Sequence, residues 1–130
     1  METLTLNPIS SIGQWRSTLR TILESYADFM SFNGDIRVYV LVSEDQNHFM
    51  LMHEGWQGHE RLYGAIVHAE IRGDKIWIHF DGMEDGIAID LLAAGISKEN
   101  IVLAFHPIEA QEFTGFAIGR IEHSIRSPTM

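Results

Sequence analysis

The feature that most constrains the fold is a change of hydrophobic period at Asn33-Gly34. Before this point, apolar residues recur every three or four positions, which predicts a helix with one buried face, capped by Ser10 or Ser11 and ending near Phe29. The residues of this face are Ile12, Trp15, Leu19, Ile22, Leu23, Tyr26 and Phe29. After it, the period becomes two, as in a strand, so we expect a helix packed on a sheet.

Four consecutive strands are predicted after the helix. The run 36–43 alternates, with Ile36, Val38, Val40 and Val42 on one side. Further strands are expected at 48–56, at 61–72 and at 75–80, joined by a polar turn, by a connection over 55–60 and by Gly73-Asp74, a two-residue hairpin signal. Short connections between successive strands imply an antiparallel meander.

The last third of the chain returns to a helical period. A helix is expected from about Glu84, with Glu84 and Asp85 in its first turn, to Gly95, followed by a short turn capped by Ser97 and a strand over 101–105. Residues 113–118 are apolar enough to dock, and 119–130 resemble a mobile tail. The prediction is one α+β domain over 1–130, with an N-terminal helix, the four-stranded antiparallel meander, a helix and a further strand, and the helices on one sheet face.

Composition narrows the classes of function. The chain has no cysteine, which removes disulfides, thiolate metal sites and a cysteine nucleophile, and it carries a formal net charge of -9. An acidic chain is repelled by phosphates, so binding of DNA by this chain alone is not expected; a DNA surface would have to use Arg16, Arg20, Arg61 and Arg72. No signal peptide or membrane-length apolar run is present, which favours a cytoplasmic protein.

Catalytic patterns are weak. Asp81, Glu84 and Asp85, with His79 on the same strand side as Asp81, offer an alternative interpretation as the magnesium site of a nuclease-like enzyme. Carboxylates at the start of a helix need only the helix dipole to account for them, so the structural interpretation is preferred. The seven histidines lack metal-binding spacing, and no nucleophile elbow or phosphate loop occurs. We expect no catalytic residues, no metal and no cofactor.

Large aromatic residues dominate the energetics of protein interfaces, so the tryptophans are candidate anchors for a partner, although tryptophans more often belong to the core. Our candidates for partner binding are Trp56, Arg61, Trp77, His68 and His106. Trp77 stands between Ile76 and Ile78, so it should lie on the sheet face opposite to them. Because several strands carry apolar residues on both sides, we also expect a homodimer.

An ordered series of short blocks resembles the XisI family, the fdxN element excision controlling factors of cyanobacteria. The blocks are Gly55-Trp56, Arg61, Tyr63-Gly64, His68, Lys75-Ile76-Trp77-Ile78, Asp81-Gly82, Glu84-Asp85-Gly86-Ile87-Ala88, Leu91, Gly95, Ile101-Val102-Leu103, Phe105-His106-Pro107 and Thr114-Gly115-Phe116-Ala117. Met83 departs from the family by replacing a common threonine that would cap the helix, and Asp81 is expected to substitute for it.

The resemblance implies a small α+β protein that accompanies a partner, XisH, an endonuclease-related protein. It also implies a role in controlling the removal of a DNA element during heterocyst differentiation, where a separate recombinase cuts. A non-catalytic regulatory factor acting through a protein partner is therefore the first hypothesis, ahead of the metal-dependent enzyme and of direct DNA binding.

Overall fold

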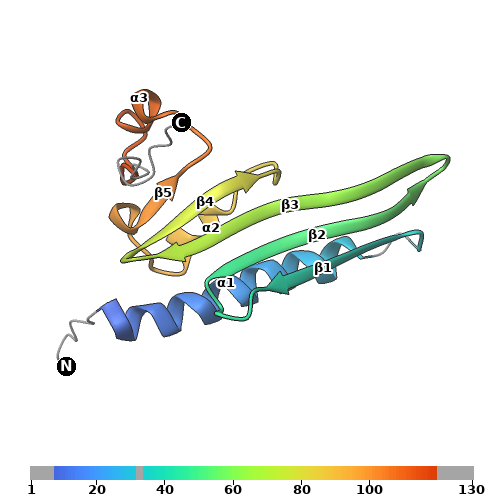
Figure 1. Ribbon diagram of the computed structural model, residues 1–130, viewed down its shortest axis with the longest axis horizontal. Coiled ribbons are helices and arrows are strands. Elements are labelled where there is room, and N and C mark those ends of the chain that lie inside the picture. Colours follow the sequence, from blue (N-terminus) through green and yellow to red (C-terminus); the bar gives the residue numbers. More distant parts are fainter. Residues whose placement is uncertain (1–7, 32–33, 120–130) are drawn as a thin grey trace, which may run out of the picture.

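The computed structural model describes residues 8–31 and 34–119 of the chain. A long helix, α1 (Pro8–Met30), lies against a five-stranded sheet of strand order β1-β2-β3-β4-β5 (Figure 1). The strands are β1 (Ile36–Val42), β2 (His48–Gln57), β3 (Glu60–Arg72), β4 (Lys75–Asp81) and β5 (Ile101–Leu103). The short helices are α2 (Ala88–Ala93), the 3-10 turn η1 (Lys98–Asn100) and α3 (Ile108–Gln111). The predicted α+β class is confirmed.

The first four strands form the expected antiparallel meander. The last strand, β5, pairs with β4 in parallel, so the sheet is mixed rather than purely antiparallel. A parallel strand needs a crossover connection, and the chain supplies one through α2 and η1. The hairpin of β2 and β3 reaches well beyond the end of β4 (Figure 1).

Several boundaries differ from the prediction, and one of them is the end of β5, which stops at Leu103 rather than at residue 105. The first helix begins at Pro8, before either proposed serine cap, which is compatible with the preference of proline for the first helical turn. The second strand continues to Gln57, so the connection is only Gly58-His59 and Gly55 lies inside β2. The helix expected from Glu84 begins at Ala88.

The late start of α2 has its cause in Asp81. Its carboxylate accepts the backbone N–H of Met83 at 3.1 Å and of Ile87 at 2.8 Å, which holds 82–87 as a loop. Asp81 thus accepts the N–H of Ile87, the residue before the helix, but it does not cap the first turn of α2, which has no side-chain cap. Glu84 and Asp85 lie in this loop and not in the first helical turn.

The core lies between one sheet face and the helices α1 and α2. Its fully buried side chains include Leu19 and Leu23 of α1, Phe49, Leu51, Ile76 and Ile78 of the sheet, and Leu91 of α2. Phe29, which was expected on the buried helix face, is 71% exposed. The buried stripe ends at Ala27, and a position two residues further lies about 200° around the helix.

The opposite sheet face is covered at one end by the chain after β5. Trp77 lies on this face, as predicted, and Gly119 lies so close that a Cβ there would be 2.6 Å from Val102 Cγ1 and 2.7 Å from Trp77 Cη2. The Ala117 N–H donates to the Ile101 carbonyl at 2.9 Å, so this part of the apolar segment 113–118 docks, whereas Phe113 at its start is 85% exposed. The mobile tail was predicted over 119–130, and residues 120–130 lie outside the described part of the chain.

None of the helices within residues 8–31 and 34–119 combines the length and the hydropathy needed to cross a lipid bilayer.

Candidate protein-interaction site

The rest of the sheet face opposite to α1 forms a surface that we call the open face. Strand alternation and register place on it side chains from β1 to β4. They are Arg37, Tyr39, Leu41, His48, Met50, Met52, Glu54, Trp56, Arg61, Tyr63, His68, Glu70, Arg72 and His79. Three of the five predicted partner-binding residues, Trp56, Arg61 and His68, lie on this face. Trp77 points to the same side of the sheet, but it is buried beneath the chain after β5, with 7% of its surface exposed.

At the end of the β2–β3 hairpin, four side chains form a group that we call the tip cluster: Glu54, Trp56, Arg61 and Tyr63. Trp56 pairs with Arg61 across the strands, and Glu54 pairs with Tyr63. The Arg61 guanidinium lies 5.5 Å from the Trp56 ring centroid and 5.9 Å from that of Tyr63, within the range of cation–π attraction.

Glu54 fixes the basic side chains of this region. One oxygen accepts from Arg61 at 3.2 Å, and the other accepts from Arg37 at 3.1 Å. Arg37 also lies over the ring of Tyr39, 4.3 Å from its centroid. The carboxylate thus holds both guanidinium groups against aromatic rings, so these long side chains lose less freedom when a partner binds.

Gly55 places the tip cluster on its strand. Its backbone has φ +155°, and a Cβ at this position would lie 2.0 Å from the Asp35 carbonyl oxygen. That carbonyl accepts the Trp56 N–H at 3.0 Å. Only glycine lets β1 approach so closely.

The tip cluster has the composition of an interface hot spot. Trp56 is 51% exposed and Tyr63 is 67% exposed, although both are large and aromatic. Tryptophan, tyrosine and arginine are the residues that most often dominate binding energy at protein interfaces. The chemistry of the tip cluster therefore suits the binding of a protein partner.

A second group on the open face, the histidine cluster, consists of His48, His68, His79 and Glu70. His48 Nδ1 and His68 Nε2 are 3.0 Å apart, and the ring centroids of His68 and His79 are 4.9 Å apart. His79 Nε2 lies 2.8 Å from Glu70 Oε1, which also accepts from Arg72 at 2.9 Å. The predicted residue Trp77 stacks on this cluster, next to His79 and beneath Arg72.

The electrostatics of this cluster favour a neutral central histidine. Burial, followed by the charges of His79 and His48, lowers the pKa of His68. Hydrogen bonds from His79 and Arg72 lower the pKa of Glu70 against the opposing effect of burial, which keeps it a carboxylate. The cluster therefore pairs a neutral central imidazole, His68, with an ionised carboxylate, Glu70.

The residues of the metal alternative are not gathered by the fold. His79 is directed at Glu70, while both oxygens of Asp81 accept backbone N–H groups. Within residues 8–31 and 34–119, no three His, Asp or Glu side chains have an arrangement that could hold a metal ion. His106 also stands apart, after β5, with its ring 4.6 Å from that of Phe105.

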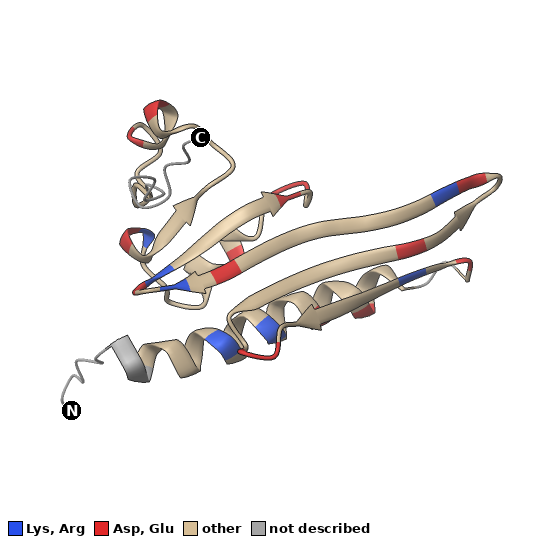
Figure 2. Cartoon of the chain, viewed as in Figure 1, with Lys and Arg blue, Asp and Glu red and all other residues tan. Residues whose placement is uncertain are grey.

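The arginines considered for DNA binding are dispersed and engaged. Arg16 donates to the Gln46 carbonyl at 3.0 Å, and Arg20 lies 3.8 Å from Glu24. Arg61 and Arg72 pair with Glu54 and Glu70. Figure 2 shows the basic positions scattered among acidic ones rather than gathered in a stripe.

Sequence reasoning missed Glu54, Tyr63 and the contacts among the histidines. The signal was available in part: a two-residue turn at Gly58-His59 would have set Trp56 against Arg61 and Glu54 against Tyr63. This register could not be predicted as long as residues 55–60 were treated as a connection.

Comparison with known proteins agrees with this architecture. The family model described as XisI protein matches residues 9–118. The chain belongs to the XisI family. Among the curated proteins, none matches the chain.

Two solved structures are similar to this XisI family member, both from Anabaena variabilis. A XisI-like protein shares 25% sequence identity and has a TM-score of 0.75, with 82% of this chain and 97% of that chain covered. The fdxN element excision controlling factor XisI shares 29% identity and has a TM-score of 0.69, with coverages of 81% and 96%. The predicted resemblance is confirmed.

Proposed function

We propose that this protein is a non-catalytic controlling factor of DNA element excision that acts by binding a protein partner through its open face. The observation that supports this most directly is the tip cluster, in which exposed Trp56 and Tyr63 are held around Arg61. A similar structure carries the name of an excision controlling factor, and a controlling factor need not itself cut DNA.

The partner that we propose is a XisH-like protein, as the family resemblance implies, with both proteins in the cytoplasm. The net charge of -9 favours a partner with a basic surface, because complementary charge accelerates association and selects against acidic partners. An endonuclease-related protein would offer such a surface. A second copy of the chain is the other occupant that this face could accept, since Leu41 on it is 47% exposed.

The test is co-expression of the protein with the XisH-like protein encoded in the same genome, followed by co-purification and calorimetric titration. Trp56→Ala and Arg61→Ala should each weaken the complex about 30-fold or more, the effect of losing a hot spot. Arg20→Ala is the matched control, because this arginine lies on α1 in an exposed pair with Glu24.

Two results would contradict the proposal. One is the absence of any complex when both proteins are present at high concentration. The other is an equal loss of affinity in Arg61→Ala and Arg20→Ala, which would mean that total charge, and not the tip cluster, controls binding. Light scattering of the protein alone reports whether a second copy occupies the face instead.

A further inference from the structure

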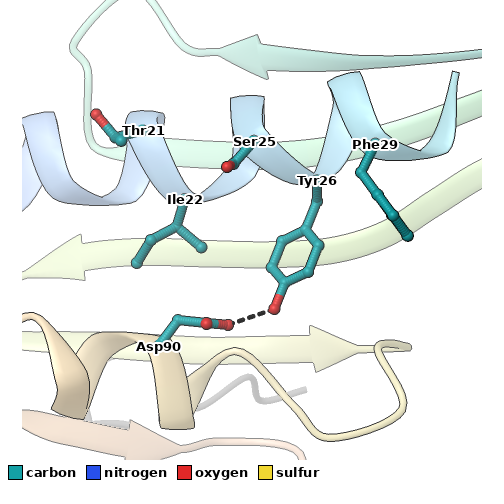
Figure 3. Close-up of a pocket in the computed structure, with 6 residues that line it drawn as sticks. All are labelled: Thr21, Ile22, Ser25, Tyr26, Phe29 and Asp90. Carbon is teal, nitrogen blue, oxygen red and sulfur yellow. Dashed lines mark hydrogen bonds between the residues drawn. The ribbon is translucent and has the colours of Figure 1, made fainter.

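A groove lies on the helical side of the molecule, away from the open face. It has a volume of about 500 Å³ and runs between α1 and α2. Its lining residues are Thr21, Ile22, Ser25, Tyr26, Phe29 and Asp90, and Figure 3 shows the α1 side chains Ile22 and Tyr26 directed toward α2. The volume is in the range of sites that bind ligands or side chains of a partner.

The walls of the groove are mainly apolar. Ile22, Tyr26 and Phe29 come from successive turns of α1, and Phe29 keeps 71% of its surface exposed. Exposed apolar side chains along a groove are typical of a surface that receives another apolar surface.

A single polar pair stands in the groove. The Tyr26 hydroxyl donates to Asp90 Oδ2 at 2.5 Å (Figure 3). This hydrogen bond, then burial, then the charges of Asp90, Asp81 and Asp85 raise the pKa of Tyr26 to about 12, so the phenol remains a donor at neutral pH. Within the described part of the chain, Asp90 Oδ1 has no hydrogen-bond partner and can accept from a ligand.

The charge around the groove has one sign. Asp90 lines it, Asp81 and Asp85 are close enough to act on Tyr26, and no lysine or arginine is among the described lining residues. The whole chain is acidic as well, with a net charge of -9. A cation is therefore attracted to this place and an anion is repelled.

We propose that the α1–α2 groove binds a basic amphipathic segment of a partner protein, with a lysine or arginine on Asp90 Oδ1 and apolar side chains against Ile22 and Phe29. A helix that lays its apolar side into a groove is a common mode of peptide recognition. This surface is separate from the open face, so the inference goes beyond the proposed function and does not depend on it.

The probe is a short synthetic amphipathic peptide of leucine and lysine, titrated into the full-length protein and followed by fluorescence anisotropy and by amide chemical shifts. The largest shifts should fall on residues 21–29 and 88–92. Asp90→Asn should weaken binding about tenfold, because it removes the charge from the hydrogen bond with the lysine. Asparagine retains an oxygen that can accept from Tyr26, so the fold should be preserved.

Two controls make the result specific. Glu109→Gln, which changes charge equally at an exposed position in α3, and Trp56→Ala on the open face should leave the affinity for the peptide unchanged. Phe29→Ala should weaken binding about tenfold through lost apolar contact.

Three outcomes would overturn the proposal. They are the absence of peptide binding, shifts spread over the acidic surface with equal effects of Asp90→Asn and Glu109→Gln, and concentration-dependent shifts at the groove without peptide, which would indicate a second copy of the chain.

Discussion

A comparison of alanine substitutions at Gly55 and Gly64 can test how the tip cluster is held on its strands. Their backbones are nearly the same, with φ +155° and φ +153°, so replacement of either by alanine forces a side chain into a conformation that costs about 1–3 kcal/mol. They differ in their surroundings. A Cβ on Gly64 meets no atom within 4 Å, whereas one on Gly55 lies 2.0 Å from the Asp35 oxygen and 2.7 Å from Ile36 Cα.

The clash at Gly55 cannot be relieved by rotating a side chain, because both contacted atoms belong to the backbone of the neighbouring chain segment. Real Cβ atoms hardly ever approach within 3.0 Å, so the start of β1 must move away. The Trp56 N–H then loses the Asp35 carbonyl, now at 3.0 Å, and the last pair of β1 and β2 separates. Each lost hydrogen bond costs about 0.5–1.5 kcal/mol.

We therefore expect Gly55→Ala to lower the free energy of unfolding by about 2 kcal/mol more than Gly64→Ala. For a chain of this size, that difference corresponds to about 6–10 °C in melting temperature. Urea unfolding followed by circular dichroism measures the free energies, and calorimetry measures the temperatures. Equal destabilisation of the two variants would refute the reasoning, because it would show that backbone conformation alone, and not the approach of Asp35, requires the glycine.

Three further predictions concern titratable side chains. Tyr26→Phe should lower the free energy of unfolding by about 1.5–3 kcal/mol, because it removes the hydrogen bond to Asp90. Because the pKa of Tyr26 is raised from 10.0 to about 12 in the fold, this stabilisation is complete below pH 10 and is lost between pH 10 and 12, so unfolding curves of protein and variant should converge there. Burial lowers the pKa of His68 below its ordinary 6.5, so its contribution is present above pH 6.5 and is lost as the pH falls; His68→Gln should flatten the fall in stability between pH 7.5 and 5.5, and an unchanged slope would contradict this. Asp81→Asn leaves one acceptor for two backbone N–H groups and should lower the free energy of unfolding by about 1–3 kcal/mol. The melting temperature of the unmodified protein should be the same in magnesium and in chelator. A rise in melting temperature with the cation that is lost in Asp81→Asn would instead support the metal hypothesis.

Much of the fold follows from local patterns. The period of 3.6 predicts α1, and alternation with a Gly73-Asp74 turn predicts β3 and β4 nearly to their ends. The place of Trp77 opposite Ile76 and Ile78 follows from alternation alone. These features depend on residues a few positions apart, so they can be inferred before any long-range contact is known.

The interaction surface could not be inferred in the same way. The sequence predicts Trp56 and Arg61 as candidates but not Glu54, the carboxylate that binds Arg61. The reason is that the connection predicted between β2 and β3 is longer than the actual turn. His48, His68 and His79 come from three strands, and they meet only once the register of the whole sheet is set.

The same limit applies to the end of the chain and to the groove. A short apolar run predicts a strand but not its direction in the sheet. The parallel direction of β5 follows from the path of α2 and η1 over the core. Tyr26 and Asp90 are 64 positions apart, yet they share a hydrogen bond because α1 and α2 pack on the same sheet face. Side-chain patterns act over a few residues, whereas register, strand direction and the meeting of distant polar groups arise from packing, which sums contacts over the whole molecule.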